Sequence, residues 1–425
     1  MLLLAAKLRN TAVFFTRQHF FNKTGRNYSF DMFEHIDSKY VSYNTLYRYL
    51  YDTTDANFFI LPSTVAQEVL RSVNSEWSSY KELLAMKKKG TYDGKVCIPG
   101  YSDTKNDATY NINFFKKNLS RKNLEEGIVN IPTTNVSFKT TIPIGKIVSV
   151  KVSYHPGQCF ADVVYEAPKG TPAKQDNGRY LAIDLGLNNL LTIVSNLPTF
   201  RSIIIDGREM KSVNRYYNKV ISEYTKKKAE EEPYFDSDEF TRRMWRDRYN
   251  KLHDYAHLIA QRVVEMAVSN RINTIVIGHN KRWKDELPFK KNVKQNFAYI
   301  PFSLIIEYIK MKSAFFGITV VEQDESYTSK ASFLDDDFIP TYKKGDATKY
   351  KFSGTRIKRG LYKTKDGVFI NADVNGAYNI LKKYLNVSSK EIITRESMGL
   401  VMVPVRIKVK ELKHRSRITV KFFNK

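Results

Sequence analysis

Apolar residues in the first part of the chain recur three or four positions apart, which is the spacing of amphipathic helices. The pattern covers residues 2–21, 43–52 and 63–89. The third stretch carries a stripe made of Val65, Val69, Leu70, Val73 and Trp77. Such a stripe is typical of core packing, so the spacing predicts an α-helical lobe over residues 1–128.

Alternation of apolar and polar residues replaces the helical spacing from about residue 134 to residue 167. Alternation is typical of half-buried strands, and the pair Pro156-Gly157 between two alternating runs signals a hairpin turn. The polar, turn-rich segment 172–179 follows. We therefore expect a small β-barrel-like module over residues 129–176.

Buried strands and helices alternate in the rest of the chain. Residues 180–196 have the pattern of a strand, a turn and a second strand, and residues 201–207 that of a third strand. A charged helical stretch, a strand at 273–278, a helix within 302–317 and a strand at 318–325 come next. Alternation of this kind after an antiparallel start predicts an RNase H-like α/β domain.

The complete pattern predicts a multidomain α+β protein. The RNase H-like domain is expected over residues 177–330 and 369–400, with an insertion at 331–368 and a basic C-terminal tail at 401–425. A chain of 425 residues, of which 42% are hydrophobic and 13% aromatic, is long enough for about two or three domains with filled cores.

The two cysteines, Cys97 and Cys159, stand alone, without a Cys-x-x-Cys partner. They build neither a disulfide framework nor a cysteine-based zinc site, which fits a reducing compartment. The apolar opening of the chain ends at Lys7, and no later run reaches the ~20 apolar residues of a membrane span. We expect an intracellular protein with no membrane partner.

Positive charge is the first indication of function. The chain has 69 Lys and Arg residues against 44 Asp and Glu, a formal charge of +25, and the basic residues are interleaved with Tyr and Phe. Such a surface attracts a polyanion, and rings among the cations stack on unpaired bases. The expected partner is nucleic acid; the alternative is a basic protein, from a proteome rich in Lys, Asn and Tyr, with no specific ligand.

Two carboxylates stand where predicted strands end. Asp184 ends a hydrophobic strand and precedes Gly186, and Asp373 lies where an apolar strand stops and an apolar-periodic helix begins. Hard Mg²⁺ ions are held by carboxylates and waters, and two such ions about 3.5 to 4 Å apart catalyse phosphodiester hydrolysis. Taken singly, Asp184 also fits a plain turn, and Asp373 fits an ordinary helix N-cap.

Wider motifs surround these residues. Asp373 is followed by Asn375 and Asn379, and Glu325 begins the run Glu-Ser-Tyr-Thr-Ser-Lys that ends at Lys330. The first pattern resembles the third RuvC motif of the transposon-encoded TnpB family. The second resembles the tyrosine-threonine-serine signature that precedes the zinc ribbon in that family, and the run AIDLGLNN around Asp184 resembles its first RuvC motif.

The resemblance covers most of the chain. Residues 65–77 and 95–101 resemble the family's recognition helices and the loop after them, and residues 160–168 resemble the end of its wedge-like β module. Residues 246–267 and 296–312 resemble the helices before and after the second RuvC motif. By this resemblance the chain starts inside the first recognition helix, and the initial strand of the β module is missing or rebuilt elsewhere.

The resemblance also implies a third metal ligand. Most TnpB proteins carry a catalytic glutamate just after the strand that ends here at Gly278, where this chain has none. In the eukaryotic and viral Fanzor relatives, and in a related subset of TnpB proteins, the glutamate lies at the end of the next strand, which matches Glu325. Asp184, Glu325 and Asp373 are thus the implied catalytic and metal-binding residues. Asp324, Glu322 and Glu286 remain alternative candidates for the third ligand in place of Glu325.

Besides the missing glutamate at Gly278, the chain departs from the family at the zinc ribbon. Ala331 and Ser332 stand where cysteines are usual, and no cysteine follows through residue 368, so we expect no zinc but a metal-free basic loop or hairpin against the nucleic acid. The acidic run Asp335 to Asp337 is expected to be a solvated turn.

A competing zinc motif is also present. His253 and His257 lie four apart on a predicted helix, as in the His-Glu-x-x-His of zinc proteases, but no third ligand stands out. A surface or packing role is expected for both histidines.

The resemblance implies an RNA-guided DNA endonuclease that is associated with a transposable element and uses Mg²⁺, with Mn²⁺ as a substitute. Its expected partners are a guide RNA and target double-stranded DNA, in a monomeric ribonucleoprotein. Guide pairing would supply specificity, while the protein reads duplex shape and a short flanking motif. Two alternatives remain: a nuclease-dead RNA-guided DNA-binding protein, and an RNase H-like transposase or resolvase that acts without RNA.

Overall fold

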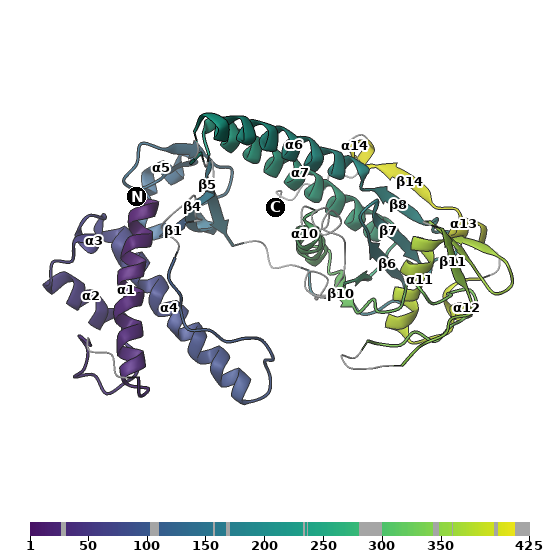
Figure 1. Ribbon diagram of the computed structural model, residues 1–425, viewed down its shortest axis with the longest axis horizontal. Coiled ribbons are helices and arrows are strands. Elements are labelled where there is room, and N and C mark those ends of the chain that lie inside the picture. The colour runs from purple at the N-terminus through teal and green to yellow at the C-terminus, as the bar shows by residue number, and fades with distance from the viewer. Residues whose placement is uncertain are drawn as a thin grey trace. The chain divides into compact units, whose positions relative to one another are not determined.

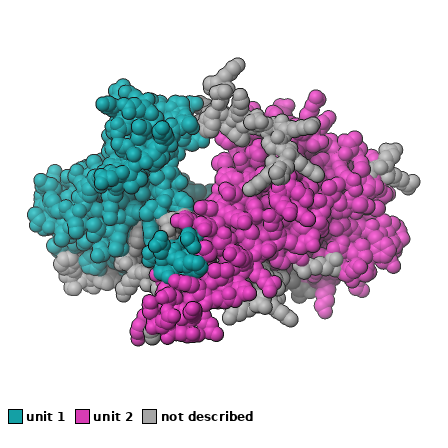
Figure 2. Space-filling model, turned by 90° about the horizontal axis from the view of Figure 1, so that it is seen from above, with its two compact units in different colours: residues 1–168, 238–243 teal, residues 169–237, 244–425 magenta. Residues whose placement is uncertain are grey.

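The computed structural model describes residues 1–26, 31–102, 110–155, 158–166, 171–232, 234–235, 237–279, 300–342, 348–358, 360–394 and 398–412. The chain divides into two compact units, coloured separately in Figure 2. Unit 1 consists of Met1–Pro168 and Asp238–Arg243, and unit 2 of Lys169–Ser237 and Met244–Lys425. Within the described ranges, no helix has both the length and the apolar character that crossing a membrane requires.

Unit 1 begins with the three expected helices and, before the last of them, a short helix that was not expected (Figure 1). They are α1 (Leu2–Asn22), α2 (Tyr43–Asp52), α3 (Ala56–Phe59) and α4 (Ser63–Lys88). The predicted stripe on α4 is buried along its whole length, and the Trp77 indole N–H donates to Thr16 Oγ1 of α1 at 2.9 Å. The spacing of apolar residues therefore identified the core face of this helix correctly.

The β strands of unit 1 form two small antiparallel sheets. Their elements, with the short helical segments between them, are β1 (Tyr110–Phe115), η1 (Lys116–Asn118), α5 (Arg121–Glu125), β2 (Ile128–Asn130), β3 (Ser137–Lys139), η2 (Ile144–Lys146), β4 (Ile147–His155) and β5 (Gln158–Tyr165). The larger sheet has the order β1-β4-β5, and the smaller one pairs β2 with β3. The hairpin predicted from alternation is confirmed by the β4–β5 pair, although its turn at Pro156 and Gly157 lies outside the described residues.

The boundary expected at residue 128, between the helical lobe and the β module, is wrong. Strand β1 lies within the stretch that was predicted to be helical, and it pairs with β4 from Tyr110 opposite Tyr154 to Phe115 opposite Ser149. The physical reason is the core: Ile112 and Phe114 pack in one buried cluster with the helices and with β4. Lobe and β module therefore share a single core.

Unit 2 is built on a six-stranded sheet with the order β10-β9-β6-β7-β8-β14. The strands are β6 (Tyr180–Leu185), β7 (Asn189–Ser195), β8 (Ile203–Asp206), β9 (Thr274–Gly278), β10 (Thr319–Gln323) and β14 (Val405–Lys408). Strands β6, β7 and β8 are antiparallel, whereas β9 runs parallel to β6 and β10 runs parallel to β9. The predicted antiparallel start followed by parallel strands is present.

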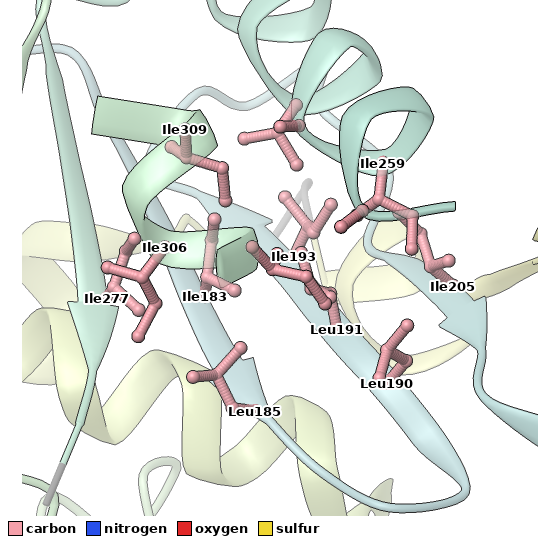
Figure 3. Close-up of a cluster of buried hydrophobic side chains, with 14 of the residues drawn as sticks. Ile183, Leu185, Leu190, Leu191, Ile193, Ile205, Ile259, Ile277, Ile306 and Ile309 are labelled. Carbon is pink, nitrogen blue, oxygen red and sulfur yellow. The ribbon is translucent and has the colours of Figure 1, made fainter. Parts of the chain in front are cut away.

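Helices cover both faces of this sheet. They are α6 (Arg208–Glu231), α7 (Glu239–Ser269), α10 (Phe302–Ala314), α11 (Ala372–Leu385) and the short α12 (Ser389–Ile392), α13 (Met398–Met402) and α14 (Val409–Leu412). Figure 3 shows Ile259 of α7 and Ile306 of α10 in the same buried cluster as Ile183 of β6. Helix α11 packs on the opposite face, with Ala182 of β6. Since neighbouring strand residues point to opposite faces, Asp184 faces α11.

The expectation of a basic tail from residue 401 is wrong for its first part. Strand β14 pairs in parallel with β8, and Ile407, Val409 and Leu412 are buried in the same core as β6. Arg262 of α7 also donates from Nε to the Leu412 carbonyl at 3.0 Å. Alternating apolar residues between the charges make this segment an edge strand of the sheet. Residues 413–425 lie outside the described residues.

Candidate metal centre

Asp184 and Asp373 come from elements that pack on one another, β6 and α11. Helix α11 follows strand β13 (Phe369–Asn371) directly, and Asn371 is its N-cap. The Asn371 side-chain oxygen accepts hydrogen bonds from the N–H groups of Asp373 at 3.0 Å and Val374 at 3.2 Å. Since Asn371 fills the capping role, the carboxylate of Asp373 is left for other partners.

Gly376 allows the Asp184 carboxylate to lie against helix α11. A Cβ atom at position 376 would stand only 3.0 Å from Asp184 Oδ2. Gly376 follows Asp373 by three residues, so both belong to the start of the helix. The absence of a side chain at 376 therefore brings the Asp184 carboxylate close to the turn that carries Asp373.

Glu325 follows strand β10, and its carboxylate reaches the end of the neighbouring strand β9. In this parallel pair Gln323 lies opposite Gly278, and the His279 N–H donates to the Gln323 carbonyl at 2.9 Å. A Cβ atom at Gly278 would stand 3.4 Å from Glu325 Oε2. The carboxylate of Glu325 thus lies beside the place where most TnpB proteins are expected to carry their glutamate.

The three carboxylates interact electrostatically. Burial, followed by the negative charges of Glu325 and Asp373, raises the pKa of Asp184 well above its usual range. Arg356 and the N–H of Leu185 act in the opposite direction. A cation placed among such groups relieves their repulsion, so this arrangement has the electrostatics of a cation site.

Glu322, one of the substitutes for Glu325, is engaged elsewhere. Lys310 donates to its Oε1, and His279 Nδ1 lies 2.6 Å from its Oε2. The Lys310 hydrogen bond and then that of His279 lower the pKa of Glu322, against the effect of burial. Its charge is therefore already paired.

Asp324, a second substitute, is bound to helix α11. Burial acts to raise the pKa of Asp324, but hydrogen bonds from Lys383 and Ser326 lower it overall. Lys383 Nζ lies 2.7 Å from Asp324 Oδ1. The remaining substitute, Glu286, lies outside the described residues. Of the candidates for the third position that the structure describes, Glu325 is the one whose charge acts on Asp184.

Asp373 has two partners that the sequence did not reveal. Asn189 Nδ2 donates to Asp373 Oδ2, and Arg356 Nη2 lies 3.4 Å from Asp373 Oδ1. Arg356 belongs to strand β11 (Thr355–Lys358) of the insertion, and its side chain is 42% exposed. Asn189 stands in the first RuvC-like motif, which was a usable signal. Nothing distinguished Arg356 from the other basic residues of the insertion.

The carboxylates do not form a closed coordination shell. Among the residues that the structure describes, no group of three or more His, Cys, Asp or Glu side chains is placed to hold a metal ion. Asp373 is instead bonded to Asn189 and Arg356. The donor set of Asp184, Glu325 and Asp373 is composed of carboxylate oxygens alone, which suits a hard cation such as Mg²⁺.

Strands β11 and β12 (Leu361–Lys363) of the insertion form a small antiparallel sheet with β13, which follows the insertion. The expected solvated acidic turn is wrong for Asp335 and Asp337, which hold this insertion together. Asp335 accepts from Ser332 Oγ at 2.6 Å, and Asp337 accepts from the Ser332 N–H at 2.7 Å and from Ser353 Oγ at 2.6 Å. Asp side chains readily accept hydrogen bonds from nearby backbone and hydroxyl groups, and here such bonds take the place of water.

His253 and His257 have the expected packing role. The ring of His257 stacks on Tyr308 of α10 with centroids 3.7 Å apart, and His253 Nδ1 lies 3.1 Å from the Tyr308 hydroxyl. Burial lowers the pKa of both histidines. Their partner is an aromatic ring, and this accounts for their spacing on α7 without zinc.

Comparison with known proteins finds similar sequences over most of the chain. Residues 161–284 match the family model OrfB_IS605, described as a probable transposase, and residues 302–380 match the Cas12f1-like TNB domain. The TnpB-like protein ORF457 of Acidianus two-tailed virus is 23% identical over 368 residues, which cover 77% of this chain and 74% of that protein. These matches confirm the resemblance to the TnpB family that the motifs predicted.

Two solved structures are also similar over most of the chain. One, a Cas12f1-sgRNA-target DNA complex, has 14% identity and a TM-score of 0.33, with 89% of this chain and 92% of that chain covered. The other, a CRISPR-Cas12f ternary complex, has 13% identity and a TM-score of 0.35, with 89% and 80% covered. TM-scores of this size do not establish a common arrangement of the parts.

Proposed function

We propose that this protein is an RNA-guided DNA endonuclease of the RuvC type, in which Asp184, Glu325 and Asp373 hold Mg²⁺ or, as a substitute, Mn²⁺. The observation that carries the proposal is that these carboxylates, from β6, from the residues after β10 and from α11, lie close enough to interact. Their negative charges add to the effect of burial in raising the pKa of Asp184. The strand order around β6 supports an RNase H-like domain. The place of Glu325 agrees with the Fanzor-like subset of the family.

Bound Mg²⁺ supplies Lewis acidity and an activated water for phosphodiester hydrolysis. The protein supplies the ligands and controls their availability. Arg356 is paired with Asp373. A DNA phosphate is a strong, bidentate partner for a guanidinium, so we expect the DNA backbone to take Arg356 from Asp373. Asp373 would then be free to join Asp184 and Glu325.

The proposed partners are a guide RNA and target double-stranded DNA. Their support is the resemblance to the TnpB family together with the formal charge of +25. A charge of this size neutralises many phosphates, while the site itself is acidic. The basic surface would bind the nucleic acids, and the carboxylates would act on one DNA phosphodiester.

The test is cleavage of double-stranded DNA that matches the RNA copurified with the protein, with Mg²⁺ and with EDTA. We expect Mg²⁺-dependent cleavage that Asp184→Ala, Glu325→Ala and Asp373→Ala each lower by orders of magnitude. The matched control is Glu322→Ala, because its carboxylate pairs with Lys310. Guided DNA binding without cleavage by the wild type would favour the nuclease-dead alternative. Activity on DNA ends or junctions without RNA would favour a transposase or resolvase.

A further inference from the structure

We infer that Asn375 and Asn379 are positioning residues, whose side-chain amides hold the turn that begins at Glu325 and thereby fix that carboxylate beside Asp184. This inference rests on the proposed function. It goes further by assigning a task to two residues of helix α11 that contact none of the reacting groups.

Both asparagine side chains are fully buried and bonded to the same backbone segment. Asn375 donates from Nδ2 to the Ala331 carbonyl at 2.8 Å, and its Oδ1 accepts from the Phe333 N–H at 2.9 Å. Asn379 donates to the carbonyls of Thr328 at 2.8 Å and Ala331 at 2.7 Å. Each asparagine is 0% exposed, so a lost bond would leave a polar group buried without a partner.

The segment that these amides hold leads directly to Glu325. Thr328 is 4% exposed and contacts the Glu325 carbonyl twice, from its N–H at 3.2 Å and from Oγ1 at 2.8 Å. Between them, Tyr327 has a left-handed backbone with a φ of 64°. A side chain other than glycine keeps this conformation only where the surrounding structure fixes it. The asparagine bonds supply that constraint.

A third residue of the same helix extends the row. Asn375, Asn379 and Lys383 lie four positions apart and therefore share one face of α11. Lys383 donates to Asp324 Oδ1 at 2.7 Å and to the Ser326 carbonyl at 3.4 Å, on either side of Glu325. The first turn of α11 carries Asp373. One helix therefore holds a proposed metal ligand and also fixes the backbone of another.

Asparagine is the side chain that this task requires at position 375, because the same amide must both donate and accept. Aspartate keeps the acceptor for the Phe333 N–H but loses the donor to the Ala331 carbonyl. Leucine at 379 keeps a similar size but leaves the Thr328 and Ala331 carbonyls without that donor. These two substitutions separate hydrogen bonding from packing.

The experiment compares wild type, Asn375→Asp and Asn379→Leu by three measurements. They are hydrogen–deuterium exchange across residues 325–333, Mn²⁺ binding by calorimetry with guide RNA and a non-cleavable phosphorothioate target DNA bound, and the Mg²⁺ concentration that gives half-maximal cleavage. We expect faster exchange across 325–333 and a rise of about 10–100-fold in the metal concentration required, the size that lost supporting contacts usually cause. Cleavage should recover partly at high Mg²⁺, and guide RNA affinity should stay unchanged.

The matched control is Asn214→Leu, because Asn214 is also buried in unit 2 and accepts a hydrogen bond, from Arg248 of α7. It should lower thermal stability while leaving the metal dependence as in wild type. Should Asn379→Leu not fold, Thr328→Val removes one hydroxyl bond to the Glu325 carbonyl and should change exchange and metal affinity in the same direction.

Wild-type exchange across 325–333, or wild-type Mn²⁺ affinity in folded Asn375→Asp, would overturn the inference. A wild-type protein that binds Mn²⁺ through Asp184 but does not cleave would refute the proposed nuclease alone, because exchange and Mn²⁺ binding need no cleavage. A wild-type protein that binds no Mn²⁺ at Asp184 with guide RNA and matched DNA bound would refute both.

Discussion

Moving the third carboxylate from Glu325 to Gly278 tests the proposed ligand set most directly. Glu325→Ala should lower cleavage by more than about 100-fold, because outer-shell changes alone typically cost about 10–100-fold. A glutamate at 278 could restore a ligand, since a Cβ atom there stands 3.4 Å from the present place of Glu325 Oε2. A side chain of that length spans such a gap.

The obstacle at position 278 is packing. Gly278 has no left-handed backbone, so a larger residue meets no strain of that kind. Its Cβ atom would, however, stand 2.3 Å from Ile380 Cδ1 and 3.0 Å from Ile380 Cγ1. Overpacking of this kind costs about 1–3 kcal/mol. Ile380→Val removes the closest atom and by itself costs about 0.5–1.5 kcal/mol.

The decisive protein is therefore the triple variant Gly278→Glu, Glu325→Ala, Ile380→Val. We expect it to cleave measurably faster than Glu325→Ala, yet slower than wild type, because a misplacement of about 1 Å can cost about 100-fold. Ile380→Val alone is the control for repacking and should cleave like wild type. Mg²⁺-dependent cleavage of guide-matched DNA is the assay. Wild-type cleavage by Glu325→Ala would show that the third ligand is assigned wrongly.

Four further outcomes are expected. The protein should copurify with a discrete RNA, and its RNA affinity should fall by about 10³-fold or more between 50 and 200 mM salt, whereas heterogeneous, salt-insensitive traces would contradict guide binding. Elemental analysis should find no stoichiometric zinc; one zinc per chain would refute our interpretation of residues 331–368. Glu286→Ala should affect cleavage only mildly. Burial acts to raise the pKa of Asp31, but hydrogen bonds from the Phe33 N–H and from His19 lower it overall. Its folded pKa lies below the unfolded one, so its contribution to stability is present above about pH 4 and is lost as the pH falls through the folded pKa. Asp31→Asn should therefore flatten the acid side of the stability curve in urea unfolding, and an unchanged acid side would contradict this.

Local pattern determined much of this protein. The buried stripe of α4, the strand that carries Asp184 and the helix that begins beside Asp373 all follow from spacings of two or three to four residues, which a sequence displays directly. The same reasoning missed strands β1 and β14, because a short edge strand is defined by the neighbour with which it pairs. Their apolar residues, such as Ile112 and Ile407, have a recognisable role only in the shared cores.

The tertiary structure decided which of several nearby carboxylates can act together. Glu322, Asp324 and Glu325 are almost adjacent in sequence, yet Lys310 engages the first, Lys383 engages the second, and the third acts on Asp184. The register of β10 on β9 and the packing of α11 on β6 set these directions. Both join segments far apart in the chain, and a linear sequence carries no record of which side chain will face which. For the same reason, the pairing of Arg356 with Asp373 was visible only in the folded protein.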